Sequence, residues 1–370
     1  MRAIITSRAY ADPAARGKLR ALVGLGVAAA AAVPDRWVPA GLVHEQQTTW
    51  GDDGGVRTVP VRIRGAATPT GDPYWHVGSI RSLLSDFRPD IVQIEEEPWS
   101  NGAASIARAA RRLRIPYVVL TRESLPVSRT TLATLRRNRV LGGAAGLISV
   151  NEQAGRLALR GRSSLPHRVI PQVGVPLPLA PARVPHPGLA IGFVGRLIPE
   201  KGLDLLFRAA VKLLGRWTIT VVGTGPAQEE LEGLAERLGI AGRVTWLGAL
   251  PRGGVEEVWP RLDCVVLPSR TTPRWIEVTP RAALEAMAHG LAVIGSAGGA
   301  IPETLGDAGL VVPEEDVTAL SETLQRLHDN PAEHQRLGAA GRKRVMDRYT
   351  DAAVAEGTVA FWRELLRATA

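Results

Sequence analysis

The feature that most constrains the fold of this chain is an alternation of short apolar runs with longer amphipathic segments. The alternation is interrupted once and then resumes. The alternation is typical of βα units around a parallel sheet. The interruption is VPLPLAPARVPHPG, residues 175–188, with five prolines. Prolines packed this closely continue neither a helix nor a central strand, so the stretch is expected to form a stiff linker. The 370 residues are also too many for one ordinary core, and two α/β domains are predicted.

The predicted division has four parts. Residues 1–177 form the N-terminal domain, 178–188 the proline-rich linker and 189–348 the C-terminal domain. Residues 349–370 form a helix that is expected to pack back towards the N-terminal domain. Two βα sets joined in this way are predicted to face each other across a cleft, and open α/β sheets bind ligands at the carboxyl ends of their strands.

The expected elements follow the apolar runs. The strands predicted before the linker are Arg2–Thr6, Val27–Val33, Asp90–Ile94, Tyr117–Leu120, Gly146–Val150 and Arg168–Ile170. Those predicted after it are Ala190–Val194, Trp217–Val222, Val244–Leu247, Cys264–Leu267, Ala292–Ile294 and Leu310–Val312. The clearest predicted helices are Ser100–Arg112, Ser128–Leu141 and Asp351–Leu366, the last with Thr350 as its N-cap.

The net charge of +9 and the pI near 10.5 raise the question of an anionic partner. The densest basic groups, 108–114 and 136–139, lie at helical spacing without interleaved aromatic residues, and no nucleic-acid-binding signature accompanies them. Solvated helix faces are the favoured interpretation. A basic rim that meets an anionic membrane or a phosphorylated acceptor stays open as the alternative, and no nucleic-acid partner is expected.

Cysteine usage and hydropathy indicate a protein of a reducing, cytoplasmic compartment. The single cysteine, Cys264, lies in an apolar run and is expected in the core. The longest apolar run, Ala21–Val33, is shorter than the about 20 residues of a membrane span. It is interpreted as a helix end, a turn and a buried strand, and no signal peptide is predicted.

Two stretches of the second half carry charges suited to a phosphate-bearing ligand. In GFVGRLIPEKG a strand ends before Gly195, and Arg196 and Lys201 follow in a loop that leads into a helix. Two cations there can neutralise a diphosphate, although an ordinary surface loop is an equal alternative. The turn VVGTGP and the Gly-rich SAGGAIPE follow other strands. The first is an ordinary strand-to-helix turn, and the second would let backbone approach a ligand closely.

WIEVTPRAALEAMAHG, residues 275–290, is the most informative stretch. Thr279 is expected as N-cap and Pro280 as first residue of a helix that ends near His289. Glu277 precedes this helix, and Glu285 lies inside it among apolar residues. A carboxylate there needs a partner, and paired carboxylates accept hydroxyls of sugars and ribose; a solvated helical glutamate remains the alternative.

Taken in this order, the two cations, the Glu-x7-Glu pair, EAMAHG and GGAIPE resemble glycosyltransferase family 4, the retaining enzymes of the GT-B fold with two Rossmann-like domains. ADPAARGKLRAL, PDIVQIEEEPWS, VIPQVGV and PSRTTPRW resemble a bacterial polysaccharide and natural-product branch. The resemblance covers essentially the whole chain. It implies transfer of a sugar from a UDP-, GDP- or dTDP-linked donor to a glycan, lipid-linked or small-molecule hydroxyl.

The resemblance also implies roles for single residues. Arg196 and Lys201, beside Gly195, would hold the donor diphosphate without a metal or other cofactor. Glu277 would accept hydroxyls of the transferred sugar and Glu285 those of the ribose. Backbone at the start of the following helix would face the phosphates.

The chain departs from the family pattern at two places. Thr279-Pro280 replaces the usual Phe-Gly pair, which removes one amide donor and leaves the amides of Arg281 and Ala282 and the Arg281 side chain. Arg122 and Glu123 stand where many members carry a histidine, and both are candidates for contact with an acceptor or with the cleft. Glu123 could give polar support to the sugar, and a surface glutamate is the equal alternative.

Three carboxylates of the first half, Glu95, Glu96 and Glu97, follow a predicted strand. They are candidates for contact with an acceptor or with cleft arginines, and an acidic loop is the alternative. Asp52 and Asp53 are interpreted as a turn, and the histidines show no metal-ligand spacing.

Three alternative functions remain. The first is a pseudo-glycosyltransferase that couples or binds a nucleotide-activated cyclitol. The second is a GT-B sugar-nucleotide epimerase, and the third is a binding protein without activity.

Overall fold

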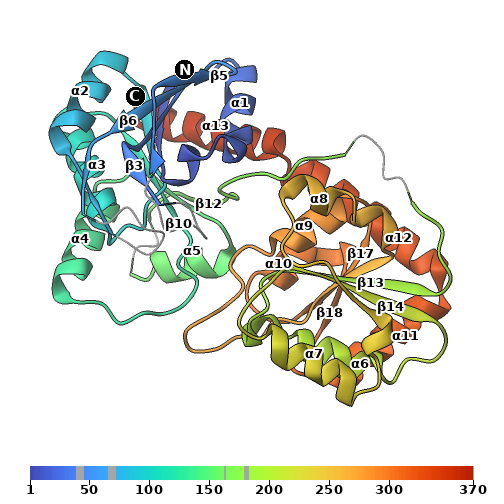
Figure 1. The fold of residues 1–370 in the computed structure, drawn as a ribbon. Helices are drawn as coiled ribbons and strands as arrows, with labels where there is room; N and C mark the ends of the chain where they lie inside the picture. Colours follow the sequence, from blue (N-terminus) through green and yellow to red (C-terminus); the bar gives the residue numbers. More distant parts are fainter. Residues whose placement is uncertain (39–45, 66–71, 162–163, 179–182, 370) are drawn as a thin grey trace. The chain divides into compact units, whose positions relative to one another are not determined.

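The computed structural model describes residues 1–38, 46–65, 72–161, 164–178 and 183–369. The chain forms two compact units. Unit 1 combines Met1–Gly174 with Asp351–Ala370, and unit 2 is Val175–Thr350. Each unit is an α/β domain with its own sheet and its own cores (Figure 1).

Unit 1 contains an eight-stranded sheet in the order β12-β11-β10-β9-β1-β2-β6-β5. Its strands are β1 (Arg2–Thr6), β2 (Ala28–Pro34), β5 (Gly51–Asp53), β6 (Val56–Val61), β9 (Ile91–Ile94), β10 (Tyr117–Thr121), β11 (Gly146–Ser149) and β12 (His167–Val169). All pairs are parallel except the β5–β6 hairpin at one edge. Two small antiparallel pairs lie outside this sheet: β3 (Arg36–Trp37) with β4 (Gln46–Gln47), and β7 (Ile63–Arg64) with β8 (Tyr74–Trp75).

Helices cover both faces of this sheet, because successive strand side chains point to opposite faces. They are α1 (Gly17–Gly24), α2 (Val77–Phe87), α3 (Asn101–Arg112), α4 (Thr131–Gly142), α5 (Glu152–Ala158) and α13 (Asp351–Thr369). Ile4 packs in a core with α2, α3, α4 and α5. Its neighbour Ile5 packs in the other core, with α1 and α13. The last helix of the chain therefore belongs to unit 1 and contacts α1.

Unit 2 contains a six-stranded sheet, parallel throughout, in the order β15-β14-β13-β16-β17-β18. Its strands are β13 (Leu189–Val194), β14 (Trp217–Val222), β15 (Val244–Trp246), β16 (Cys264–Leu267), β17 (Ala292–Ser296) and β18 (Leu310–Val312). Its helices are α6 (Leu203–Ala210), α7 (Gln228–Arg237), α8 (Arg252–Glu256), α9 (Arg281–Ala288), α10 (Ile301–Leu305), α11 (Val317–Asp329) and α12 (Pro331–Arg348). Residues of α6, α7 and α11 pack in one core and those of α9 and α10 in the other, and α12 contributes Leu337 to the first and Val345 to the second.

The strands predicted from the sequence are present within one or two residues of their expected ends. α4 starts at Thr131 and not at Ser128, because the Thr130 hydroxyl accepts a hydrogen bond from the Ala133 amide and caps the helix there. The run Ala21–Val33 is, as predicted, a helix end, a turn and a buried strand. β5, β6 and α2 were not expected.

The division into units falls between Gly174 and Val175, before the proline-rich segment. Residues 179–182 of the predicted linker lie outside the described residues. Among the described residues, no helix combines the length and the apolar character that crossing a bilayer requires.

Candidate active site

In unit 2, the loops that follow β13 and β14 touch each other. The Gly195 amide donates to the Val222 carbonyl over 2.9 Å, and the chain then turns through Pro199–Lys201 into α6. Gly223 has a φ of +133°, and a Cβ on it would lie 1.8 Å from the Gly195 oxygen. Gly223 therefore permits a close contact between two loops, which agrees with the structural turn predicted for VVGTGP.

Lys201 and Glu277 come together at the carboxyl edge of this sheet. Lys201 Nζ lies 2.5 Å from Glu277 Oε2, and Ser269 Oγ donates to the same oxygen over 3.4 Å. Only 8% of Glu277 is exposed, and the ammonium of Lys201 also lies 5.3 Å from the ring centre of Trp275. An ammonium group has three donors, so Lys201 can bind an anion while it neutralises this carboxylate. Arg196 is exposed in the same loop, without a side-chain partner in the described part of the chain.

The Gly-rich turn after β17 supports the backbone of Glu277. Gly299 has a φ of +57°, and a Cβ on it would lie 2.3 Å from the Glu277 carbonyl oxygen. That carbonyl accepts from the Ala300 amide over 2.8 Å. Gly299 therefore lets this turn pack against the Glu277 segment, and the expected approach of the turn's backbone to a ligand stays a prediction.

The start of α9 differs from its prediction. Thr279 is exposed and does not cap the helix; Pro280 occupies the N-cap position, and Arg281 is the first helical residue. Pro280 has φ −75° and ψ 75°, and the Arg281 amide donates to the Thr279 carbonyl over 2.8 Å, which is an inverse γ-turn. The Arg281 amide, predicted to remain available, is thus already used. The next two helical amides lack intrahelical acceptors, because the first intrahelical bond is donated by Leu284.

Glu285 has the partner that its apolar surroundings require. Arg281 Nε donates to Glu285 Oε1 over 2.8 Å, one helical turn away, and 16% of the glutamate side chain is exposed. The helix ends with His289 at the C-cap, as predicted. Its Nε2 lies 2.8 Å from Glu256 Oε2.

In unit 1, Glu95 is buried and not directed towards an open surface, contrary to the expectation that it contacts an acceptor. Lys18 Nζ lies 2.6 Å from Glu95 Oε1, and Tyr10 and Gln93 donate to the same oxygen over 3.0 and 2.7 Å. Gln172 donates to Oε2 over 2.9 Å. Neither charged side chain is more than 1% exposed. Burial, followed by the charge of Glu95, raises the pKa of Tyr10 well above its usual value.

The next two carboxylates have different surroundings. Glu96 is 4% exposed and lies 3.3 Å from Arg8, and burial raises its pKa although Arg8 opposes the shift. Within the described part of the chain, the Oε1 atom of Glu96 lacks a hydrogen-bond partner. Glu97 accepts from the Thr121 hydroxyl over 2.7 Å and from the Arg122 amide over 2.9 Å. It therefore fixes the chain where β10 ends.

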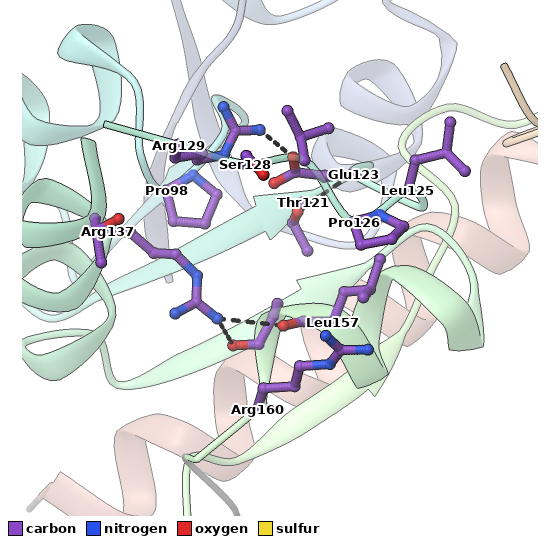
Figure 2. A pocket seen from close by; sticks show the side chains of 13 residues that line it. Pro98, Thr121, Glu123, Leu125, Pro126, Ser128, Arg129, Arg137, Leu157 and Arg160 are labelled. Atoms are coloured by element: carbon purple, nitrogen blue, oxygen red, sulfur yellow. Dashed lines mark hydrogen bonds and ion pairs between the residues drawn. The ribbon is translucent and has the colours of Figure 1, made fainter. Parts of the chain in front are cut away.

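Glu123 lines a pocket of about 360 Å³ at this end of β10. Figure 2 shows Arg129 donating a hydrogen bond to Glu123, and Arg137 donating one to the carbonyl of Leu157. Arg137 also donates to the carbonyl of Ala158. Arg129 stacks 3.8 Å above the ring centre of Trp99. Burial raises the pKa of Glu123, opposed by Arg129. The remaining lining residues are Pro98, Thr121, Leu125, Pro126, Val127, Ser128, Thr134 and Arg160.

Asp52 and Asp53 were predicted to form a turn, but they are the last residues of strand β5. The turn itself is Gly54-Gly55, because its positive φ values of 61° and 83° favour glycine. The Gly55 amide donates to Asp52 over 2.8 Å, and Asp53 pairs with Arg20 over 2.9 Å. Within the described ranges, no three histidine, cysteine or acidic side chains gather in a way that could hold a metal ion. His44 lies outside the described residues.

Two family models match the chain. Residues 182–344 match "Glycosyl transferases group 1", and residues 11–173 match the "Glycosyl transferase 4-like domain". A D-inositol 3-phosphate glycosyltransferase from Frankia alni is 30% identical over 318 residues, 72% of this chain and 76% of the relative. The chain belongs to the group 1 glycosyltransferases. Its two Rossmann-like domains are those of the GT-B fold.

Two other relatives of this glycosyltransferase carry different names. A mannosyltransferase of Mycolicibacterium smegmatis, GDP-mannose-dependent and acting on phosphatidylinositol monomannoside, is 32% identical over 42% of this chain and 43% of its own length. The 2-deoxystreptamine glucosyltransferase of Streptomyces kanamyceticus is 28% identical over 70% of this chain and 73% of the relative. The match thus spans less than half of the first relative.

Solved structures share the fold of this glycosyltransferase. Sucrose-phosphate synthase from Thermosynechococcus elongatus superposes with a TM-score of 0.73 at 21% identity, over all of both chains. Anabaena HepE in complex with UDP and glucose gives a TM-score of 0.69 at 16% identity, over 98% of this chain and all of that one.

Several residues of these sites were not predicted from the sequence. Lys18 lies in a stretch that carried part of the resemblance, but it received no role. Arg137 belongs to a basic group interpreted as a solvated helix face, although it lines the pocket beside Glu123. For Ser269, next to Glu277, the sequence offers no signal beyond its place after a strand.

Proposed function

We propose that the protein transfers a sugar, with retention of anomeric configuration and without a metal, from a nucleoside-diphosphate sugar to an acceptor hydroxyl. The donors in question are UDP-, GDP- and dTDP-sugars. The observation that carries the proposal is the 2.5 Å pair of Lys201 and Glu277, where a cation and a hydroxyl acceptor meet at the carboxyl edge of a parallel sheet. Family membership supports it.

The donor groups are assigned by charge. Arg196 and Lys201, beside Gly195, bind the diphosphate. The backbone amides at the start of α9, which follow Thr279 in the sequence, add uncharged hydrogen-bond donors. Glu277 accepts hydroxyls of the sugar. Glu285 accepts those of the ribose and is oriented by Arg281.

The transfer step needs only these groups. The bond from the anomeric carbon to the phosphate oxygen breaks, and the acceptor oxygen bonds to that carbon on the same face. The acceptor proton passes to the departing phosphate oxygen. The cations stabilise the negative charge that develops on the leaving group, and electrostatic stabilisation of this kind supplies most of the rate enhancement in many enzymes.

The test measures release of nucleoside diphosphate from UDP-, GDP- and dTDP-sugars with a panel of acceptors, for the natural protein, Lys201→Met and the control Lys212→Met. Lys212 is an exposed lysine of the same unit. Removal of one charge-stabilising donor is expected to lower kcat by about 100-fold or more, with no change in the control. Equal activities of the two variants would overturn the assignment.

The same assay examines the finer parts of the proposal. We expect EDTA to leave the rate unchanged, because no metal takes part. We also expect the NMR coupling constant of the anomeric proton in the product to match that in the donor, because the configuration is retained. Absence of nucleoside diphosphate release from every sugar donor would favour the nucleotide-cyclitol alternative. Conversion of the donor without any acceptor would favour the epimerase.

For the acceptor, the pocket of Glu123 supports an anionic group, because three arginines, Arg129, Arg137 and Arg160, line it with a single glutamate. Relatives named for inositol phosphate and for 2-deoxystreptamine represent an anionic and a cationic acceptor. The charge of this pocket favours the former.

Arg160→Gln tests this, with Arg156→Gln as control; both arginines are exposed and lie four residues apart. The Arg160 variant is expected to raise KM for an inositol phosphate and to leave KM for neutral acceptors unchanged. Preference for 2-deoxystreptamine would refute the anionic assignment. Such acceptors include phospholipids, and we therefore propose peripheral contact with an anionic membrane.

A further inference from the structure

Four arginines line a groove between α3 and α4 of unit 1. Arg108 and Arg111 lie on α3, Arg136 and Arg139 lie on α4, and the groove has a volume of about 460 Å³. Arg136 lies 3.8 Å from Asp72, which is the one ion pair that these four form among the described residues. The positive charge of the groove is therefore largely uncompensated.

Two of these guanidinium groups are free to meet a partner. Arg108 and Arg139 are exposed, and their side chains make no hydrogen bond or ion pair within the described ranges. The floor of the groove is apolar and includes Val77, Ala104 and Val140. A basic rim over an apolar floor suits a ligand that has both phosphate and hydrocarbon.

The outer face of α4 extends this surface with exposed leucines. Leu132 and Leu135 are 61% and 47% exposed. With Arg136 and Arg139 they occupy positions i, i+3, i+4 and i+7, which share one face of a helix. Large apolar side chains beside free arginines are typical of helices that lie in the interface of an anionic bilayer.

We propose that this surface, the α3–α4 groove with Leu132 and Leu135, docks on the anionic face of a lipid bilayer and receives a lipid phosphate between the arginines. The inference rests on the membrane contact proposed above and names the residues that make it. A soluble polyanion would gain nothing from the leucines. Nucleic acid would need several stacking side chains, whereas Tyr74 is the one aromatic side chain among the described residues that line the groove.

The experiment measures flotation of the full chain with vesicles of phosphatidylcholine, alone or mixed with phosphatidylglycerol. Binding is expected only with the anionic lipid, and it should weaken as salt rises. Each arginine near such a surface contributes about fivefold in partitioning, so Arg108→Gln/Arg139→Gln should lose about 25-fold in binding. The control is Arg363→Gln/Arg367→Gln, two exposed arginines of α13 with the same change in charge.

The leucines are tested separately, at a salt concentration that screens the charges. Leu132→Ser/Leu135→Ser should lower the remaining binding several-fold, and Leu214→Ser, which alters a leucine that is 74% exposed in unit 2, should not. Circular dichroism checks that each variant is folded, and nucleoside diphosphate release with a water-soluble acceptor should be equal in all of them.

The outcomes separate the two proposals. If the natural protein floats with no vesicle, both the membrane contact and this surface are wrong. If it floats but the two arginine pairs lose binding equally, the contact stands and the surface assigned to it is wrong. If inorganic pyrophosphate binds the groove and vesicles do not, the groove is a site for soluble anions and the lipid assignment is overturned.

Discussion

Replacing Lys18 by Met is expected to destabilise unit 1 strongly, because it leaves Glu95 buried without its cation. The two charged atoms lie 2.6 Å apart, and the side chains are 1% and 0% exposed. At an effective dielectric constant of about 20, attraction at this distance is about 6 kcal/mol. Desolvation offsets part of it, and removal of one partner of such a pair typically costs about 3–5 kcal/mol.

Removing both charges should cost much less. In Lys18→Met/Glu95→Gln the oxygen of the new amide can still accept from Tyr10 and Gln93, and neither side chain of the former pair carries a charge. The double variant is therefore expected to lie within about 2 kcal/mol of the natural protein and to be more stable than the Lys18 variant. Urea unfolding is best followed by hydrogen exchange in peptides of β9 and α13, since a chain of two units need not unfold in one step.

Two results would refute this reasoning. One is a Lys18→Met protein as stable as the natural one, which would mean that the pair is solvated. The other is a double variant whose loss of unfolding free energy equals the sum of the losses of the two single variants. If Glu95 instead bound the acceptor, Glu95→Gln would raise KM for the acceptor in protein that remains folded.

Three further predictions concern other sites. Burial raises the pKa of Glu96, so the folded protein favours the protonated carboxyl. The stability that this protonated form provides is lost as pH rises through the raised pKa. The stability gained by Glu96→Gln should therefore grow as pH rises above the ordinary value of 4.5, measured by urea unfolding; a pH-independent difference would contradict the burial argument. Gly299→Ala should destabilise unit 2 by about 1–3 kcal/mol, because of its positive φ and the contact with Glu277, whereas Gly242→Ala, with open space around it, should be near neutral in the same assay. Burial raises the pKa of the Cys264 thiol, so a thiol reagent should label it only after unfolding; rapid labelling of the folded protein would place it outside the core.

The sequence was sufficient where local chemistry decides the structure. The helix predicted over Ser100–Arg112 is α3, and Ser100 is its N-cap, whose hydroxyl accepts from the Ala103 amide. Parallel strands appeared as short apolar runs because both of their faces are buried. β5 was missed because its residues are polar and lie at an edge, where one side of the strand faces solvent.

The site was predictable in its residue types but not in its pairings. Lys201 and Glu277 are 76 residues apart, and only the sheet order brings them together. Glu95 was mistaken for a surface group because its cation lies 77 residues away and Gln172 equally far on the other side. The start of α9 was predicted at Pro280, one residue too early, because proline suits both the first turn of a helix and the inverse γ-turn that it forms here.

The most direct test of the donor site is thermal stability in the presence of UDP, GDP, ADP and dTDP, repeated with Glu285→Ala and with the exposed control Glu236→Ala. A nucleotide at about 100 times its dissociation constant adds about 2.7 kcal/mol of stability. We predict a raised melting temperature with one nucleotide, retained in the Glu236 variant and lost in the Glu285 variant. No shift with any nucleotide, or a shift that persists in Glu285→Ala, would contradict the donor site described for unit 2.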